Sequence, residues 1–146
     1  MITDFRGKTA VITGAASGIG RGLAVRCAAE GMHVVASDVE EGALAETVAL
    51  AGGDAIGVTA DVADPEAVQR LADAACDAFG AVHLLCNNAG VFQAGIVWER
   101  TVADWQWVLG VNVWVFSHWQ NRAKVAKERD ELEAVSDYGR PLVKQA

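Results

Sequence analysis

Three of the four glycines in the stretch VITGAASGIGRGLA, namely Gly14, Gly18 and Gly20, lie between a short apolar run and a segment with helical periodicity. A tight turn between a strand and a helix needs backbone freedom, and missing Cβ atoms let a pyrophosphate approach the backbone amides. The N-terminus of the following helix adds unpaired N–H groups and partial positive charge. This pattern predicts a dinucleotide site, with a glycine-rich turn that holds no ligand as the alternative. The expected cofactor-binding residues of the loop are Gly14, Ser17, Gly18, Ile19 and Gly20.

An acidic side chain follows the loop at a distance that suits the same cofactor. Asp38 lies 18 residues beyond Gly20, at the end of the next apolar run. A carboxylate there can accept hydrogen bonds from the two ribose hydroxyls of an adenosine. It would also repel a 2′-phosphate, and neither Ala15 nor Ala16 offers a cationic side chain. The sequence therefore predicts NAD as the cofactor, in preference to NADP.

Asparagines interrupt apolar sequence at two further places. Asn87 and Asn88 follow the run VHLLC, where open α/β sheets bind ligands; alternatively they form a polar turn bonded to local backbone. Asn112 lies on the apolar face of a predicted helix, where a carboxamide without partners costs about 1–3 kcal/mol. Either Asn112 serves the chemistry of the site, or neighbouring backbone groups satisfy it.

Alternating strand and helix patterns must position these residues. Apolar, β-branched runs predict four strands, at Thr9–Thr13, His33–Ser37, Ala55–Thr59 and Val82–Cys86. Helical spacing predicts the intervening helices Ile19–Glu30, Glu40–Ala51 and Pro65–Phe79. Right-handed crossovers then give a Rossmann-type, doubly wound parallel α/β sheet. We expect this sheet to be truncated after four strands, in the order 3-2-1-4, with the fourth strand at an edge.

A long helix and a charged tail complete the predicted chain. The helix should run from Thr101 to about Ala126, with a capping box formed by Thr101 and Asp104. Its apolar face carries Trp105, Val108, Asn112, Val115 and Trp119. From Lys124 the composition becomes strongly charged, as is typical of a solvated helix. The expected division is a Rossmann NAD-binding domain over residues 1–123 and a charged helical tail over residues 124–146.

Composition excludes several classes of protein. A formal net charge of −7 argues against nucleic acid as a partner. The most apolar helical stretch is nine residues long, whereas a membrane span needs about 20, so we expect no membrane partner. No charged-then-apolar leader opens the sequence, which predicts a cytoplasmic protein. The three cysteines and three histidines are scattered, so no metal site is expected, and the cysteines are interpreted as buried free thiols.

The spacing Gly-x3-Gly-x-Gly, followed by Asp61 after the third strand and NNAG after the fourth, resembles the short-chain dehydrogenase/reductase family over residues 5–116. The resemblance implies that Asp61 bonds the adenine ring, with Val62 framing it. It implies that Asn88, Ala89 and Gly90 lie along the cofactor and stabilise the central strand. It also matches Asn112 to the catalytic asparagine that bends the long helix and holds a water in the proton relay. The tryptophan-rich helix resembles the family's dimer helix, which implies a homo-oligomer.

The chain departs from the family where the chemistry should be completed. The family uses a serine after a fifth strand and a Tyr-x3-Lys pair to transfer the hydroxyl proton. Tyr138 is the only tyrosine, Leu142 stands four residues after it, and Pro141 lies between them. Two hypotheses therefore remain. One is an NAD-dependent oxidoreductase, moving a hydride between nicotinamide and an alcohol or carbonyl compound, whose active site is incomplete in this chain. The alternative is a non-catalytic nucleotide-binding or interaction module.

Overall fold

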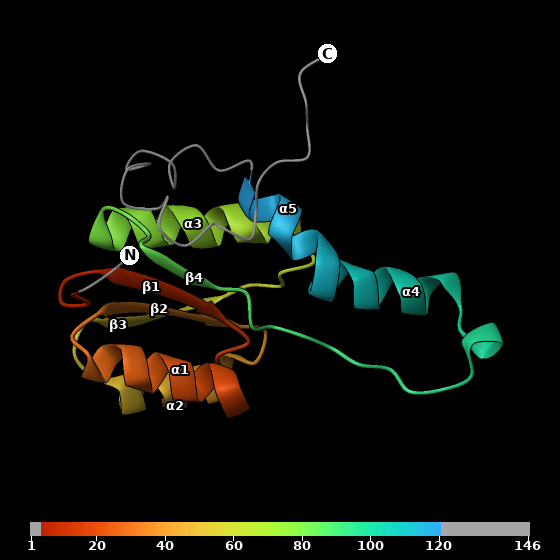
Figure 1. The fold of residues 1–146 in the computed structure, drawn as a ribbon, viewed down its shortest axis with the longest axis horizontal. Helices are drawn as coiled ribbons and strands as arrows, with labels where there is room; N and C mark the ends of the chain where they lie inside the picture. The colour runs from red at the N-terminus through yellow and green to blue at the C-terminus, as the bar shows by residue number, and fades with distance from the viewer. Residues whose placement is uncertain (1–3, 121–146) are drawn as a thin grey trace, which may run out of the picture.

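The computed structural model describes residues 4–120, which form a four-stranded parallel sheet with helices on both faces (Figure 1). The strands are β1 (Thr9–Thr13), β2 (His33–Asp38), β3 (Ala55–Thr59) and β4 (Leu84–Cys86). Their order is β3-β2-β1-β4, which confirms the predicted topology. The fourth strand is two residues shorter than predicted at its start, because only Leu84–Cys86 joins the ladder with β1.

The central strand β1 fixes the register of the sheet. It pairs in parallel with β2 from Thr9 opposite His33 to Thr13 opposite Ser37, and with β4 from Ala10 opposite Leu84 to Ile12 opposite Cys86. All five residues of β1 are buried. Burial on both faces explains why its sequence, TAVIT, is a continuous apolar and β-branched run without alternation.

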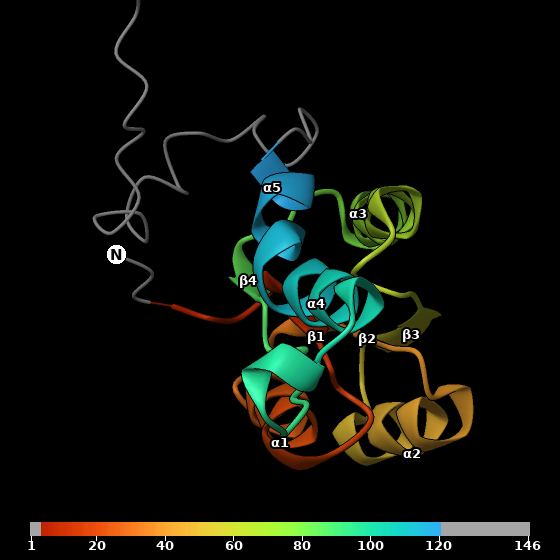
Figure 2. The ribbon, with the colours of Figure 1, turned by 90° about the vertical axis from the view of Figure 1, so that its right-hand side faces the viewer.

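Two helical layers enclose the sheet (Figures 1 and 2). Helices α1 (Gly18–Ala29) and α2 (Glu41–Ala51) cover one face, while α3 (Pro65–Phe79) and α5 (Val115–Gln120) pack together over the other. Each face has its own apolar core. The first is centred on Ile12, Ala24 and Leu44, and the second on Val11, Val68 and Leu71. Alternate residues of β1 thus supply opposite cores, as the pleat of a strand requires.

Local capping chemistry explains where two helices begin. Asp64 precedes Pro65 and accepts a hydrogen bond from the Glu66 amide, so α3 begins as the sequence predicts. Thr101 and Asp104 form the predicted capping box at the start of α4 (Val102–Leu109). The backbone and side-chain hydrogen bonds from Thr101 hold the pKa of the Asp104 carboxyl below its usual value.

The helix predicted from Thr101 to Ala126 is not one regular α-helix: it is interrupted around Asn112, where the resemblance implied a bend. After α4 the chain makes a π-helical turn, η2 (Gly110–Trp114), and then resumes as α5. Asn112 lies within this turn, where its side chain binds the backbone of Val91. The part of the predicted helix beyond Gln120, and the predicted tail over 124–146, lie outside the described residues.

A short 3-10 turn, η1 (Val97–Glu99), lies in the connection between β4 and α4. This connection runs away from the sheet before the chain returns through α4 (Figure 1). Within residues 4–120 no helix is long and apolar enough to cross a membrane.

Candidate functional site

The predicted site residues follow the carboxyl ends of all four strands. Because the strands are parallel and ordered β3-β2-β1-β4, these ends meet at one edge of the sheet. Asp61 follows β3, Asp38 ends β2, the glycine loop follows β1, and Asn88 follows β4. The structure therefore brings together, at one edge, residues that lie far apart in the sequence, such as Gly14 and Asn88, which are 74 positions apart.

The glycines of the loop serve two different purposes. Gly14 and Gly18 adopt positive φ angles of 65° and 53°, which residues with a Cβ rarely adopt. Gly20 is required by a close approach instead: a Cβ there would lie 2.1 Å from the Gly14 carbonyl oxygen and 2.6 Å from Asn88 Nδ2. The loop thus folds back tightly on the first turn of α1. Apart from its chain neighbours and the backbone of its own helix, no described residue lies within 4 Å of a Cβ built at Gly18, so that part of the loop is open.

The N-terminus of α1 is suited to an anion. Ser17 occupies the N-cap position in an extended conformation, but its side chain makes no capping hydrogen bond. The first turn of α1 carries no acidic residue, so no carboxylate of that turn offsets the partial positive charge there. Ile19 lies in the same turn with 77% of its surface exposed. These features agree with a phosphate-binding turn whose ligand side is open.

Asp38 is held beside the glycine loop by backbone amides. Its Oδ2 accepts a hydrogen bond of 2.8 Å from the Ala16 amide. Its Oδ1 accepts from the amides of Val39, at 2.8 Å, and Glu40, at 3.2 Å. The carboxylate therefore bridges the loop after β1 and the turn after β2, and its position is fixed before any ligand arrives.

Asn88 joins the end of β4 to the end of β1. Its Nδ2 donates to the carbonyl oxygens of Thr13, at 2.9 Å, and Gly14, at 3.2 Å. The amides of Asn88 and Ala89 both donate to Thr13 Oγ1 at 3.1 Å, and that hydroxyl donates to Cys86 O. The side chain of Asn88 thus braces the glycine loop from the protein side. The buried Oδ1 of the neighbouring Asn87 has no hydrogen-bond partner in the described structure.

Asn112 is satisfied by backbone, which is one of the two alternatives that the sequence left open. Its Oδ1 accepts from the Val91 amide at 2.9 Å, and its Nδ2 donates to the Val91 carbonyl oxygen at 2.8 Å. This paired contact ties the π-helical turn η2 to the segment that follows Gly90. A Cβ at Gly90 would lie 3.5 Å from Asn112 Oδ1, so the two segments are in close contact.

The two predicted adenine-site residues have different environments. Asp61 is exposed, and its Oδ1 accepts a hydrogen bond of 2.9 Å from the Ala63 amide. Val62 is 5% exposed and belongs to the core between the sheet and α3. Its carbonyl oxygen lies 3.2 Å from His118 Nδ1 on α5. Asp61 therefore faces solvent at the sheet edge, while Val62 anchors the turn.

Two cysteine thiols, one on β4 and one on α1, are poor nucleophiles. Burial, with a smaller contribution from Cys27, raises the pKa of the Cys86 thiol at the end of β4. Burial, with a smaller contribution from Glu30, likewise raises the pKa of Cys27 on α1. Both thiols therefore stay protonated at neutral pH. All three cysteines are free, as predicted, but only Cys27 is buried, while Cys76 and Cys86 are partly exposed.

Sequence reasoning missed three residues that shape the loop: Thr13, Arg21 and Thr47. Thr13 and Thr47 are buried, and both use their hydroxyls to bind backbone around the glycine turn. Arg21 donates to the Ala16 carbonyl oxygen. The sequence did offer two signals: Thr13 ends an apolar strand, and Thr47 lies on the inner face of a helix. Each position also fits ordinary packing, so neither indicated a role in the loop.

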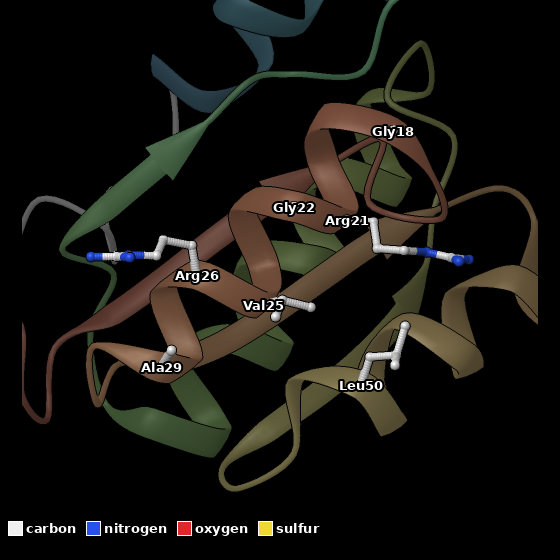
Figure 3. A pocket seen from close by; sticks show the side chains of 7 residues that line it. All are labelled: Gly18, Arg21, Gly22, Val25, Arg26, Ala29 and Leu50. Carbon is white, nitrogen blue, oxygen red and sulfur yellow. The ribbon is translucent and has the colours of Figure 1, made fainter.

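A hollow lies elsewhere, on the outer surface of the helices. A groove of about 510 Å³ runs between α1 and α2, from Gly18 and Arg21 at one end to Ala29 and Leu50 at the other (Figure 3). It shares only Gly18 with the predicted site residues. Within residues 4–120 no group of three metal-ligating side chains is brought together.

This glycine turn, acidic strand end and parallel sheet define a nucleotide-binding Rossmann-type domain. Residues 8–128 match the family model of the short chain dehydrogenases. The chain therefore belongs to the short-chain dehydrogenase/reductase family, as the motifs predict.

Individual relatives agree with this assignment. The chain is 44% identical over 117 residues to 3beta-hydroxysteroid dehydrogenase 1 of Eggerthella lenta, covering 77% of this chain and 45% of that protein. It is 46% identical over 113 residues to 1-deoxy-11-beta-hydroxypentalenate dehydrogenase of Streptomyces arenae, covering 73% and 40%. A short chain dehydrogenase/reductase from Burkholderia phymatum, solved in complex with NAD, has a TM-score of 0.79 and 51% identity, covering 86% of this chain and 44% of that one. The chain thus spans less than half of each relative.

The close approach at Gly20 gives a direct test of the loop geometry. Gly20→Ala should lower the free energy of unfolding by about 1–3 kcal/mol, because the added methyl group overlaps the Gly14 carbonyl oxygen. Gly22→Ala is the matched control, since a Cβ there meets nothing within 4 Å and alanine favours the helix by about 0.5–1 kcal/mol. Urea denaturation of both variants checks the expectation, and a Gly20→Ala protein as stable as wild type would contradict the geometry.

Proposed function

We propose that this chain binds NAD at the carboxyl edge of its sheet and supplies the cofactor-binding part of an oxidoreductase. The reaction class is hydride transfer between the nicotinamide and an alcohol or carbonyl compound. One observation carries the proposal: the Asp38 carboxylate is fixed beside a glycine turn whose helix N-terminus has neither a side-chain cap nor an acidic residue in its first turn. The NAD complex of the relative from Burkholderia phymatum supports the same cofactor.

Different residues at the sheet edge would contact different parts of the cofactor. Ser17, Gly18 and Ile19 would receive the pyrophosphate on their amides, with Gly14 and Gly20 closing the turn. Asp38 would accept from the adenosine ribose, and Asp61 with Val62 would frame the adenine. Asn88, Ala89 and Gly90 would flank the cofactor further along the edge, and Asn112 would support that segment through Val91. When bound, NAD supplies the hydride acceptor, and this chain's residues hold and orient it.

The preference for NAD follows from charge at the ribose end. A 2′-phosphate would meet the Asp38 carboxylate, which three amides hold in place and which cannot easily turn away. The cation closest along the loop, Arg21, donates to Thr47, to the carbonyl oxygens of Ala16 and Ala43, and to Glu46. It is therefore engaged with the protein and poorly placed to neutralise an added phosphate.

Calorimetric titration with NAD and NADP tests this preference. Wild type should bind NAD more tightly, and Asp38→Ala should weaken NAD binding by about 1.5–3 kcal/mol, the contribution of hydrogen bonds to a charged group, and relax the preference. Asp38→Asn keeps the shape of the side chain but removes its charge. It should therefore bind NADP more tightly than wild type does, with less loss of folding stability than Asp38→Ala. Equal or tighter binding of NADP by wild type would refute the role given to Asp38.

The residues expected to transfer the proton are the ones that this chain does not match. Its only tyrosine, Tyr138, has Leu142 rather than a lysine four residues later, and it lies outside the described residues. Both polar atoms of the Asn112 carboxamide are bound to Val91. We therefore propose that this chain alone binds cofactor without completing an active site. The same observation favours the second candidate, a non-catalytic nucleotide-binding module.

The purified 146-residue chain should show no alcohol oxidation or carbonyl reduction above background with NAD(H). The reason is the missing acid–base pair, since positioned proton transfer contributes about 10²–10⁴-fold to such a rate. A panel of alcohols and ketones, assayed with wild type and Tyr138→Phe, checks this. Turnover that Tyr138→Phe abolishes would show that Tyr138 does serve as the acid–base group. Turnover that survives the change would reveal a different proton donor.

We also propose that the chain self-associates through the helical segment α4–η2–α5. Its large apolar side chains remain exposed, with Trp105 at 46%, Trp107 at 48%, Trp114 at 56% and Phe116 at 53%. An exposed apolar surface of this kind is typical of an interface.

Sedimentation across a wide concentration range should therefore detect a species larger than the monomer. Trp114→Asp should shift the equilibrium towards monomer, because it places a charge in the proposed contact. Leu50→Asp, which changes an exposed apolar residue on α2, is the control and should leave the equilibrium unchanged. A strictly monomeric wild type at high concentration would contradict the proposal.

A further inference from the structure

We propose that Arg21 and Thr47 are positioning residues for the cofactor: they orient the two peptide groups of the glycine loop that face Asp38 and the expected pyrophosphate. The inference rests on the proposed NAD binding and adds to it two residues that lie on helices and outside the glycine motif. Its basis is the hydrogen-bonding pattern of the segment Ala15–Ala16.

Every backbone polar group of Ala15 and Ala16 has a specific partner. The Ala15 amide donates to Ser37 O at 3.0 Å, and the Ala16 amide donates to Asp38 Oδ2 at 2.8 Å. The Ala15 carbonyl oxygen accepts from Thr47 Oγ1 at 2.8 Å, and the Ala16 carbonyl oxygen accepts from Arg21 Nη2. Both alanines are buried, at 0% and 4% exposed. The segment is thus held by β2 on one side and by side chains of α1 and α2 on the other.

Thr47 acts on the same peptide group that binds Asp38. The carbonyl group of Ala15 and the amide of Ala16 belong to one planar trans peptide, so they point in opposite directions. Thr47 holds the oxygen end of this plane, and Asp38 accepts from the nitrogen end. Losing the Thr47 hydroxyl would therefore free the peptide to rotate, and the Asp38 carboxylate would lose its fixed distance to the loop.

Arg21 determines which way the Thr47 hydroxyl donates. Thr47 Oγ1 lies within hydrogen-bond distance of two carbonyl oxygens, Ala15 at 2.8 Å and Ala43 at 3.2 Å, but it has a single proton. Arg21 Nε donates to this hydroxyl at 2.9 Å, and Arg21 Nη2 donates to the Ala43 oxygen at 3.1 Å. Because the guanidinium satisfies Ala43 and occupies an acceptor position of the hydroxyl, the Thr47 proton is directed to Ala15.

Arg21 also orients the next peptide group. It holds the Ala16 carbonyl oxygen, so the Ser17 amide of the same plane points to the side opposite Arg21. That amide begins the turn in which we place the pyrophosphate. The guanidinium reaches from α1 towards α2 (Figure 3), and its planar fork serves three acceptors at once, a geometry that a lysine ammonium does not reproduce.

Five variants separate positioning from general stability. Thr47→Val removes the hydroxyl at nearly constant shape, and Thr47→Ser retains it. Arg21→Met keeps the apolar stem, and Arg21→Lys keeps the charge without the fork. Glu46→Gln is the matched control, because the Glu46 carboxylate also contacts Arg21, at 3.2 Å, but is 69% exposed and does not touch the loop.

Two measurements apply to each variant, at a temperature where all are folded by circular dichroism. Amide hydrogen exchange at Ala16 in the cofactor-free chain reports the loop itself. Calorimetric Kd values for NAD and NADP report its effect on binding. We expect Thr47→Val, Arg21→Met and Arg21→Lys to speed exchange at Ala16, to raise the Kd for NAD about five- to tenfold, and to narrow the NAD/NADP ratio. Thr47→Ser and Glu46→Gln should stay within about twofold of wild type, since each keeps the loop contacts.

The outcomes distinguish this inference from the proposed function. Wild-type exchange and wild-type Kd values in Thr47→Val and Arg21→Met would overturn the positioning role. Lower unfolding midpoints with an unchanged NAD/NADP ratio would overturn it too, because a purely structural role has that signature. If the wild type binds no NAD, the proposed function fails. Faster amide exchange confined to the loop in the Thr47→Val and Arg21→Met variants would then show that Thr47 and Arg21 orient the loop. It would also show that this role does not serve NAD binding.

Discussion

The close approach of Gly20 to the Gly14 carbonyl oxygen is the contact on which the rest of the site depends. It turns the chain back on itself directly after β1, so that α1 begins against the end of its own strand. Asn88 then fits beside the same oxygen and binds both Gly14 and Thr13. A larger residue at position 20 would displace the Gly14 carbonyl oxygen and the Asn88 carboxamide, and so weaken one of the contacts between the end of β4 and the end of β1. The shape of the turn and the position of the Asn88 side chain therefore depend on each other.

The side chains around this turn mainly hold backbone. Asp38, Asn88 and Asn112 each bind main-chain groups of a neighbouring segment, and Thr13 and Thr47 do so with buried hydroxyls. A loop fixed in this way loses little conformational freedom when a ligand binds, which favours affinity. It also explains how amides of the α1 N-terminus can be presented at an open surface while the residues behind them stay buried.

Local sequence patterns were sufficient for the sheet and for the glycine turn, because both depend on short-range physics. The sequence TAVIT is typical of a buried parallel strand, and the glycine spacing between strand and helix is typical of a phosphate-binding turn. The π-helical turn was not predictable in this way, since its partner, Val91, lies 21 residues from Asn112. The contacts of Arg21 and Thr47 were hidden for a similar reason. A polar side chain on a helix is usually expected to face solvent. Only the packing of α1 against α2 places these two side chains under the loop.

The hydrogen bonds that support the glycine loop come from a limited part of the chain. Each hydrogen bond that fixes the glycine loop, Asp38 and Asn88 comes from residues between Thr13 and Thr47 or from the segment after β4. These segments lie within residues 8–128, which match the family model, although the chain spans only 45% of the relative from Eggerthella lenta. The contacts that hold the glycine loop, Asp38 and Asn88 therefore all come from described residues of this chain. Asn112 has both polar atoms bound to Val91, so its carboxamide joins the π-helical turn η2 to the segment that follows Gly90.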